Sequence, residues 1–137
     1  MRVRKTMAAA MLAACALTAI SLTPAGAATG DGLLPHPGPE GLVWVEEMTG
    51  DGGVASGGAW EALPTVLTVA CEGGGNVQVT MQQQTQLAAL TVDCPVGTAG
   101  VGSVTLEAGT VQSGSFTVGV DASNDDVRWA VTVTQPE

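Results

Sequence analysis

From Thr65 onward, hydrophobic and polar residues alternate along the chain in six short runs, which are separated by turn-forming residues. A period of two places successive side chains on opposite faces of a β-strand. The inward-facing residues that this alternation predicts are Leu67, Val69 and Cys71; Val77, Val79 and Met81; Ala88, Leu90, Val92 and Cys94; Val104 and Leu106; Phe116, Val118 and Val120; and Val127, Trp129, Val131 and Val133. Six such strands are typical of an all-β fold, a single antiparallel β-sandwich of jelly-roll or immunoglobulin-like topology with one solvated face on each sheet.

The stretch before Thr65 has a weaker pattern. The run LVWVEEM at 42–48 predicts a first strand. The run TGDGGVASGG at 49–58 is so rich in glycine that it predicts a loop too flexible to carry a core. The next residues, AWEALP at 59–64, predict one short turn of helix that ends before the proline.

Three segments are expected along the chain. Residues 1–27 have the parts of a signal peptide: a cationic start (RVRK), an apolar stretch, and the small residues AGA before the cleavage site. Residues 28–41 are rich in Pro and Gly and lack periodicity, which predicts a flexible arm. Residues 42–137 are the expected β-sandwich domain, with a regular core at 65–134.

The signal peptide favours secretion into the extracellular space. Its apolar stretch is followed by a cleavage site and by no second hydrophobic span, so no transmembrane anchor is expected. The sequence LAAC, which ends at Cys15, leaves one alternative open, because it resembles the lipobox of bacterial lipoproteins, in which the cysteine is lipidated. Apolar sequence continues past Cys15, where a lipoprotein usually turns polar, and we therefore favour free secretion over a lipid anchor.

Composition and charge exclude several classes of partner. Cleavage after residue 27 leaves 110 of the 137 residues, enough for one small domain. Cleavage also removes three cations, so the formal net charge changes from −9 to −12 and Arg128 is the one Lys or Arg that remains. Such an acidic surface repels phosphate backbones and anionic lipids, which argues against nucleic-acid and membrane-surface binding. The dominance of Gly, Ala, Val and Thr is typical of a GC-rich genome, such as that of an actinobacterium.

Cys71 and Cys94 remain as an even pair once Cys15 has left with the signal peptide. In an oxidising compartment such a pair predicts a structural disulfide. A metal site or a redox dithiol is disfavoured, because the chain has no C-x-x-C motif and no His near either cysteine. Both cysteines have inward parity, so the bond is expected in the core, where it stabilises the fold by about 3 kcal/mol.

The acidic run DASNDD at 121–126 raises the possibility of a calcium loop. A loop of the EF-hand kind needs Gly at its sixth position and a bidentate Glu at its twelfth. Those positions hold Asp126 and Thr132, and no helix is expected on either side. Asp and Asn are also favoured in turns, because they bond to their own main chain. We therefore expect a hairpin turn here and no metal site.

No catalytic machinery and no cofactor are expected. His36, the one histidine, lies between two prolines in the arm, with nothing to hold it as a general base. The carboxylate pairs at 46–47 and 125–126 face opposite ways if extended, so they do not converge as glycosidase carboxylates do. The run CEGGGN at 71–76 lacks the Lys and the helix of a phosphate-binding loop and predicts a hairpin turn.

Trp44 and Trp60 are the candidate ligand-binding residues. If exposed together they would form a stacking platform for a sugar or an apolar ligand, and if buried they would cover one end of the sandwich. Two tryptophans without any Tyr make a sparse binding face, so we favour packing. Arg128 is expected to face outward beside Asp125 and Asp126, where a surface ion pair is worth about 0–1 kcal/mol.

The ending GSFTVGVDASNDDVRWAVTVTQ resembles the terminal hairpin of small extracellular bacterial jelly-roll modules. Those modules often close with a Trp-x-Val-x-Val-x-Gln strand, here Trp129, Val131, Val133 and Gln135. The resemblance is confined to this C-terminal stretch and implies an accessory module that binds, spaces or protects and does not catalyse. The chain is also similar in size and charge to the acidic apoproteins of the enediyne antibiotics, although those sandwiches carry two disulfides and this chain has cysteines for one.

These observations predict a secreted, non-catalytic structural or protein-interaction module of the extracellular space or cell envelope, with an extracellular or envelope protein as its partner. The alternative is a carrier of a small apolar or carbohydrate ligand, bound between the sheets or beside Trp44 and Trp60. A hydrolase is the least supported class, because no acid, base and nucleophile converge. Strand edges with almost no Lys leave edge-to-edge pairing open.

Overall fold

The computed structural model describes residues 32–137. The predicted signal peptide at 1–27 and the alternative lipid anchor at Cys15 lie outside the described residues. The elements are the 3-10 turn η4 (Gly38–Glu40) and the strands β1 (Gly41–Thr49), β2 (Gly52–Ala59), β3 (Thr65–Glu72), β4 (Asn76–Gln82), β5 (Gln86–Asp93), β6 (Gly100–Leu106), β7 (Gly114–Ala122) and β8 (Arg128–Thr134). Within the described part of the chain, no helix is long and apolar enough to cross a membrane.

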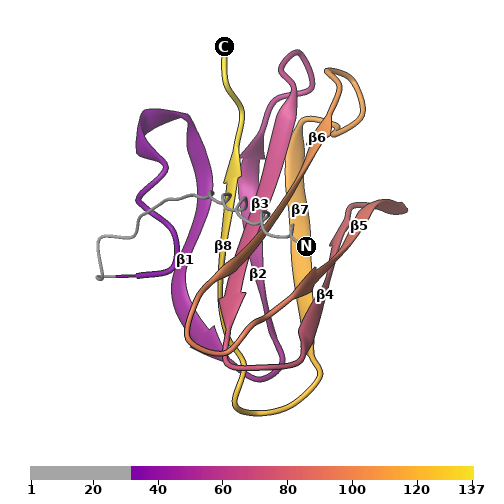
Figure 1. The fold of residues 1–137 in the computed structure, drawn as a ribbon. Helices are drawn as coiled ribbons and strands as arrows, with labels where there is room; N and C mark the ends of the chain where they lie inside the picture. The colour runs from indigo at the N-terminus through magenta and orange to yellow at the C-terminus, as the bar shows by residue number, and fades with distance from the viewer. Residues whose placement is uncertain (1–31) are drawn as a thin grey trace, which may run out of the picture. The chain divides into compact units, whose positions relative to one another are not determined.

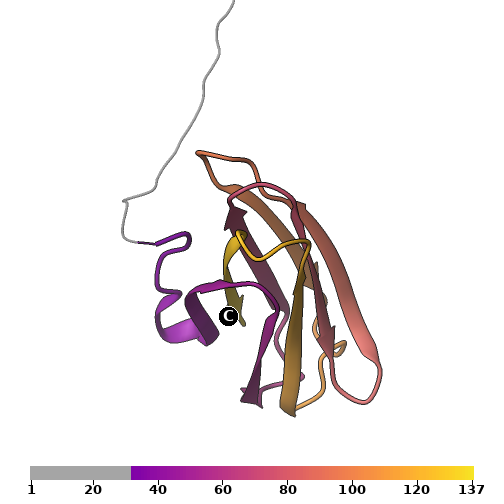
Figure 2. The same cartoon turned by 90° about the horizontal axis from the view of Figure 1, so that it is seen from below.

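The strands form two antiparallel sheets that pack face to face (Figures 1 and 2). Sheet A has the strand order β1-β8-β3-β6, and sheet B has the order β2-β7-β4-β5. The pairs β1–β8, β2–β7, β3–β6 and β4–β5 are nested along the chain, as if one long hairpin had been rolled up. Eight strands paired in this way form a jelly roll, so the predicted β-sandwich is confirmed and its immunoglobulin-like alternative is wrong.

The core lies between the two sheets and consists of the residues that the alternation places inward. The six predicted strands correspond to β3 through β8. Their largest fully buried side chains include Leu67, Met81, Phe116 and Trp129. Ala88, Leu90, Val104 and Leu106, also predicted to face inward, are partly buried and pack against this core. The indole Nε1 of Trp129 donates to the carbonyl oxygen of Gly50 at 2.7 Å, so its one polar atom is satisfied.

The predicted disulfide between Cys71 and Cys94 is present in the core. Its sulfur atoms are 2.08 Å apart and its Cα atoms are 5.0 Å apart, and both cysteines are buried. Cys71 belongs to β3 of sheet A, and Cys94 directly follows β5 of sheet B. The bond therefore joins the two sheets covalently at one end of the sandwich.

Two predictions for the stretch before Thr65 are wrong. The glycine-rich run predicted as a loop contains β2, which pairs with β7 from Gly52 to Ala59. Pairing uses main-chain groups, and it therefore does not require the side chains that the hydropathy pattern detects. The predicted helical turn is a single hydrogen-bonded turn instead of a helix, in which the main-chain N–H of Leu63 donates to the oxygen of Trp60 at 3.2 Å.

The central strands of sheet A depart from the prediction of one solvated face per sheet. Ala130 and Thr132, expected to face solvent, are 0% and 8% exposed, and Ala70 is as buried as Ala130. These three residues lie on β8 and β3, the two inner strands of the sheet, so a neighbouring strand flanks each short side chain on both sides. The outer face of sheet A therefore exposes mainly side chains of its edge strands.

The predicted arm contacts the domain within its described residues. The main-chain N–H of Gln135 donates to the main-chain oxygen of Glu40, the last residue of η4, at 3.0 Å. The ring of His36 meets the ring of Trp44 edge to face, with centroids 4.6 Å apart. The expectation that nothing holds His36 is therefore wrong. Its Nδ1 also accepts from the main-chain N–H of Gly38 at 3.0 Å, so its contacts are an indole and a main-chain amide.

Candidate interaction face

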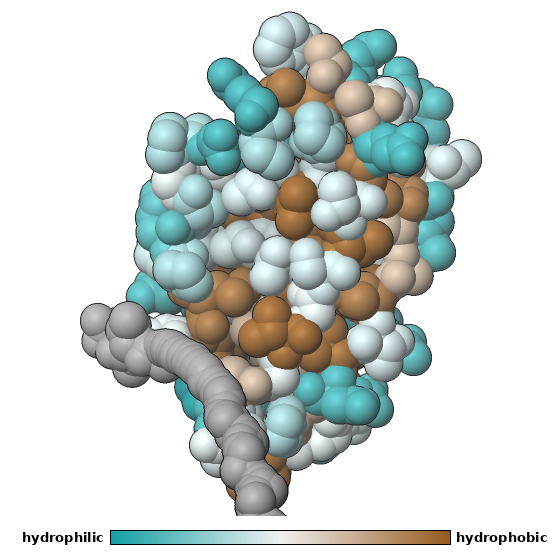
Figure 3. Space-filling view, turned by 45° about the horizontal axis from the view of Figure 1, so that its top comes forward, coloured by the Kyte–Doolittle hydropathy of each residue, from teal (hydrophilic) through white to brown (hydrophobic). Residues whose placement is uncertain are grey.

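The outer face of sheet A carries an uncharged surface across its four strands. One row contains Trp44, Thr132, Thr68 and Ser103, which the strand register places side by side. The next row contains Ala130, Ala70 and Val101, and the irregularity of β1 that holds Glu46 and Glu47 lies at its β1 end, outside the uncharged set. We call these seven residues the sheet A face. Figure 3 looks obliquely onto this side of the molecule, where hydrophobic and pale, weakly polar residues fill the middle and hydrophilic residues gather along the flanks.

Two large apolar side chains of the sheet A face are exposed, one on each edge strand. Trp44 on β1 is 39% exposed, and Val101 on β6 is 61% exposed. Between them lie the buried Ala70, Ala130 and Thr132. Thr68 and Ser103 complete the surface and share a hydrogen bond of 3.4 Å. An uncharged surface with exposed apolar side chains and a polar rim is the arrangement expected of a protein contact surface.

The two candidate tryptophans are both exposed, so the favoured expectation that they are packed is wrong. Trp60 is 58% exposed and lies in the connection between β2 and β3. Its main chain is fixed by Gln135, whose side-chain amide accepts from Trp60 N at 2.9 Å and donates to Trp60 O at 3.0 Å. Within residues 32–137 no aromatic contact joins Trp44 to Trp60, and the aromatic neighbour of Trp44 is His36.

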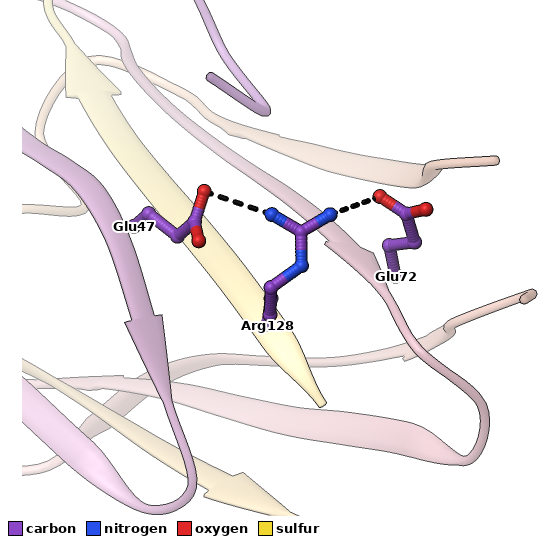
Figure 4. Close-up of polar contacts among 3 residues, drawn as sticks. All are labelled: Glu47, Glu72 and Arg128. Carbon is purple, nitrogen blue, oxygen red and sulfur yellow. Dashed lines mark hydrogen bonds and ion pairs between the residues drawn. The ribbon is translucent and has the colours of Figure 1, made fainter. Parts of the chain in front are cut away.

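Arg128 marks the charged border of the sheet A face. It was expected to pair with the aspartates that precede it, but it bridges Glu47 on β1 and Glu72 on β3 instead (Figure 4). Its Nη1 lies 2.9 Å from Oε1 of Glu47, and its Nη2 is hydrogen-bonded to Oε1 of Glu72. The hydrogen bond that Arg128 donates to Glu47, together with the charges of both carboxylates, raises the pKa of Arg128 above its usual value. The guanidinium therefore stays charged and links the three strands.

The acidic run before β8 is a turn, as predicted. The side-chain oxygen of Asn124 accepts from the N–H of Asp126 at 2.9 Å, which is the local bond that favours Asn in turns. Ser123 adds a second bond by accepting from Asn76 N at 2.9 Å. The turn connects β7 of sheet B to β8 of sheet A, so it is a crossing between sheets and the hairpin expected here is wrong. Among the described residues, no group of three or more Cys, His, Asp or Glu is placed to hold a metal ion.

The CEGGGN run is likewise a crossing, from β3 in sheet A to β4 in sheet B, and not a hairpin. Gly73, Gly74 and Gly75 all have positive φ angles, which explains the need for glycine. The crossing is tied to the disulfide, because Gly74 N donates to Cys94 O at 2.7 Å and Cys94 N donates to Gly75 O at 2.9 Å. These amides already have partners in the protein, so they do not form a phosphate cradle.

The two carboxylate pairs also have structural explanations. Glu46 and Glu47 lie at an irregularity of β1, between the paired residues Val45 and Met48. Glu47 is engaged by Arg128, and the aspartates of the turn before β8 are exposed.

Val101 is not among the candidate residues that the sequence predicts. The sequence does show an apolar residue of outward parity in a strand without charged residues, which could have marked Val101 as a candidate. Its exposure, however, depends on the position of β6 at the edge of sheet A. Comparison with known proteins adds no relative, because no protein-family model, no curated protein and no solved structure matches the chain.

Proposed function

We propose that this protein is a secreted, non-catalytic module that binds another protein of the extracellular space or cell envelope through the sheet A face. The observation that carries the proposal is the position of two exposed apolar side chains, Trp44 and Val101, on the two edges of one uncharged sheet surface. The centres of protein interfaces are depleted in charge and enriched in aromatic residues. Secretion is supported by the signal-like sequence of residues 1–27.

The charge of the chain indicates the chemistry of the partner. The formal net charge is −9, and the acidic side chains lie outside the sheet A face. A partner with an apolar centre and a basic rim would match this distribution and would be steered toward it. Association with such a partner should become slower as the ionic strength rises, because screening weakens the steering.

The test is a quantitative capture experiment from the culture fluid and solubilised envelope of the native host. The immobilised forms are the unmodified protein, Trp44→Ser and Val101→Ser, with Trp60→Ser and Val96→Ser as matched controls. Both control residues are exposed and lie outside the sheet A face. Loss of an interface anchor of this kind weakens binding by about tenfold or more. Equal capture by all five forms, or an equal loss in the controls, would contradict the proposal.

A carrier of a small apolar or carbohydrate ligand is the second candidate function. It is supported by the exposure of both Trp44 and Trp60, because an accessible indole can stack on a sugar or an apolar ring. Trp129 is fully buried and provides an unchanged fluorescence background. A ligand that quenches the emission of the unmodified protein but not that of Trp44→Phe or Trp60→Phe would favour the carrier.

A further inference from the structure

A groove of about 730 Å³ lies on sheet B, away from the sheet A face. It is formed where the hairpin between β4 and β5 meets the connection between β6 and β7, two loops at the same end of the sandwich (Figure 1). Of its twelve lining residues, four are Gln and five are Ser or Thr, and the others are Ala55, Leu87 and Phe116. None of the twelve is charged.

The chain has thirteen Asp and Glu residues, yet none of them lines this groove, and this indicates which class of ligand the groove suits. A site for a cation or a basic peptide would carry carboxylates, and a site for an anion would carry Arg or Lys. Side-chain amides and hydroxyls instead both donate and accept hydrogen bonds without carrying charge. The lining therefore suits a neutral ligand that itself presents many donors and acceptors.

The walls of the groove are held together by Gln83. Its side-chain nitrogen donates to the main-chain oxygens of Gln112 at 2.8 Å and of Ser115 at 3.0 Å, and its side-chain oxygen accepts from Gln112 N at 2.9 Å. The two bonds to Gln112 join the β4–β5 hairpin to the β6–β7 connection, and the third joins it to the start of β7. The shape of the groove is thus set before a ligand arrives, which reduces the ordering cost of binding.

Other polar side chains of the lining are exposed and open to a ligand. Gln82 and Thr117 lie opposite each other on β4 and β7, and Gln84 lies in the hairpin. All three are exposed, and in the part of the chain that the structure describes their side chains make no hydrogen bond to protein. They supply amide and hydroxyl groups beside the small apolar Ala55, which pairs with Thr117.

We propose that this groove binds a neutral, hydroxyl-rich glycan chain. A glycan presents alternating hydroxyl groups and C–H surfaces, which the free amides, the hydroxyls and the apolar lining residues match. An extended peptide is a poorer fit, because recognition by strand addition needs an open sheet edge. The floor strands β7 and β4 are interior strands of sheet B and are already paired on both sides.

The experiment is a titration of isotope-labelled protein with four neutral probes, cellohexaose, xylohexaose, maltohexaose and hexa-N-acetylchitohexaose, followed by NMR. One probe should shift the side-chain amide signals of the groove glutamines. Gln84→Ala and the near-isosteric Thr117→Val should weaken its binding by about fivefold each, as expected for one lost hydrogen bond. Thr105→Val, on β6 and outside the groove, is the matched control and should bind as the unmodified protein does.

No shift with any of the four probes at millimolar concentration would overturn the proposal. Binding that Gln84→Ala and Thr117→Val leave unchanged would also overturn it, because the glycan would then lie elsewhere. If the anionic chain polygalacturonate binds more strongly than every neutral probe, the inference that the uncharged lining selects a neutral ligand is contradicted. The groove is separate from the sheet A face, so these outcomes do not depend on whether the proposed protein partner exists.

Discussion

Strands β8 and β2 lie in the two different sheets and are stabilised in opposite ways. In β8, the five residues from Trp129 to Val133 are all buried, because the strand lies between β1 and β3 and faces the core. In β2, only Ala59 is buried, the strand lies at the edge of sheet B, and four of its eight residues are glycine. The comparison indicates that β8 is held mainly by side-chain burial and β2 mainly by its main-chain pairing with β7.

The largest expected effect comes from removing the main buried side chain of β8. Trp129→Ala should destabilise the fold by about 3–5 kcal/mol, because it leaves a cavity and also removes the hydrogen bond to Gly50. This is a large share of the stability of a small domain. Urea unfolding followed by far-UV circular dichroism measures the change. A loss below about 1 kcal/mol would show that burial in β8 is not what holds sheet A.

The disulfide should contribute the next largest effect, because it joins the end of β3 to the end of β5. The double variant Cys71→Ala/Cys94→Ala should lose about 3 kcal/mol, as expected for closing a loop across a separation of 23 positions. Thermal unfolding of the oxidised protein and the variant measures this difference. Matching midpoints would mean that the packing of β3 and β5 alone holds the two sheets together.

Gln135 extends the buried character of β8 beyond the end of the strand. Its side chain is 5% exposed and bonds to both main-chain groups of Trp60 and to Oγ1 of Thr65 at 3.0 Å. Gln135→Ala should cost about 2 kcal/mol, because these buried partners lose their bonds. The exposed Gln78→Ala is the control and should stay within about 0.5 kcal/mol of the unmodified protein in the same unfolding assay.

The smallest expected effect, and the one of opposite sign, lies in β2. A Cβ atom at Gly57 would meet only Oγ of Ser115 at 4.0 Å, so Gly57→Ala should stabilise by about 0.5 kcal/mol by restricting the unfolded chain. The same substitution at Gly73 is the control. At Gly73 φ is +116°, and a Cβ atom would lie 2.5 Å from the main-chain oxygen of Asp126. Gly73→Ala should therefore destabilise the fold by at least about 1 kcal/mol. Destabilisation by both would mean that β2 needs its glycines for reasons beyond main-chain pairing.

The same contrast explains which strands could be predicted from the sequence. The strands β3 to β8 alternate Val, Leu and Thr with polar residues, so their inward residues could be identified before their partners were known. In β2 the run GGVASGGA has too few side chains to show a period, and its strand character comes from pairing with β7, about sixty positions away. The local sequence pattern of β2 does not indicate that it pairs with β7.

The connections between strands and the candidate surfaces show a second limit of prediction from the sequence. The turns after β3 and β7 were recognised from Gly, Asn and Asp, but turn chemistry does not reveal whether the next strand joins the same sheet. The exposure of Trp44 and Val101 likewise depends on β1 and β6 being edge strands. In the sequence, the glutamines of the groove cannot be distinguished from ordinary solvated residues. Gln83 joins the walls of the groove only because the fold places Gln112 within hydrogen-bonding distance of its side chain.

Site-specific photo-cross-linking tests the central claim, that the sheet A face is the contact surface, most directly. A benzophenone amino acid would replace Val101 in one form of the protein and Val96, which is 80% exposed and outside this face, in another. Both forms would be irradiated in the presence of native culture fluid and envelope, and the adducts identified by mass spectrometry. If the sheet A face is the contact surface, a discrete protein adduct forms at position 101 and is absent at position 96. Adducts at both positions in equal yield, or at position 96 alone, would contradict it.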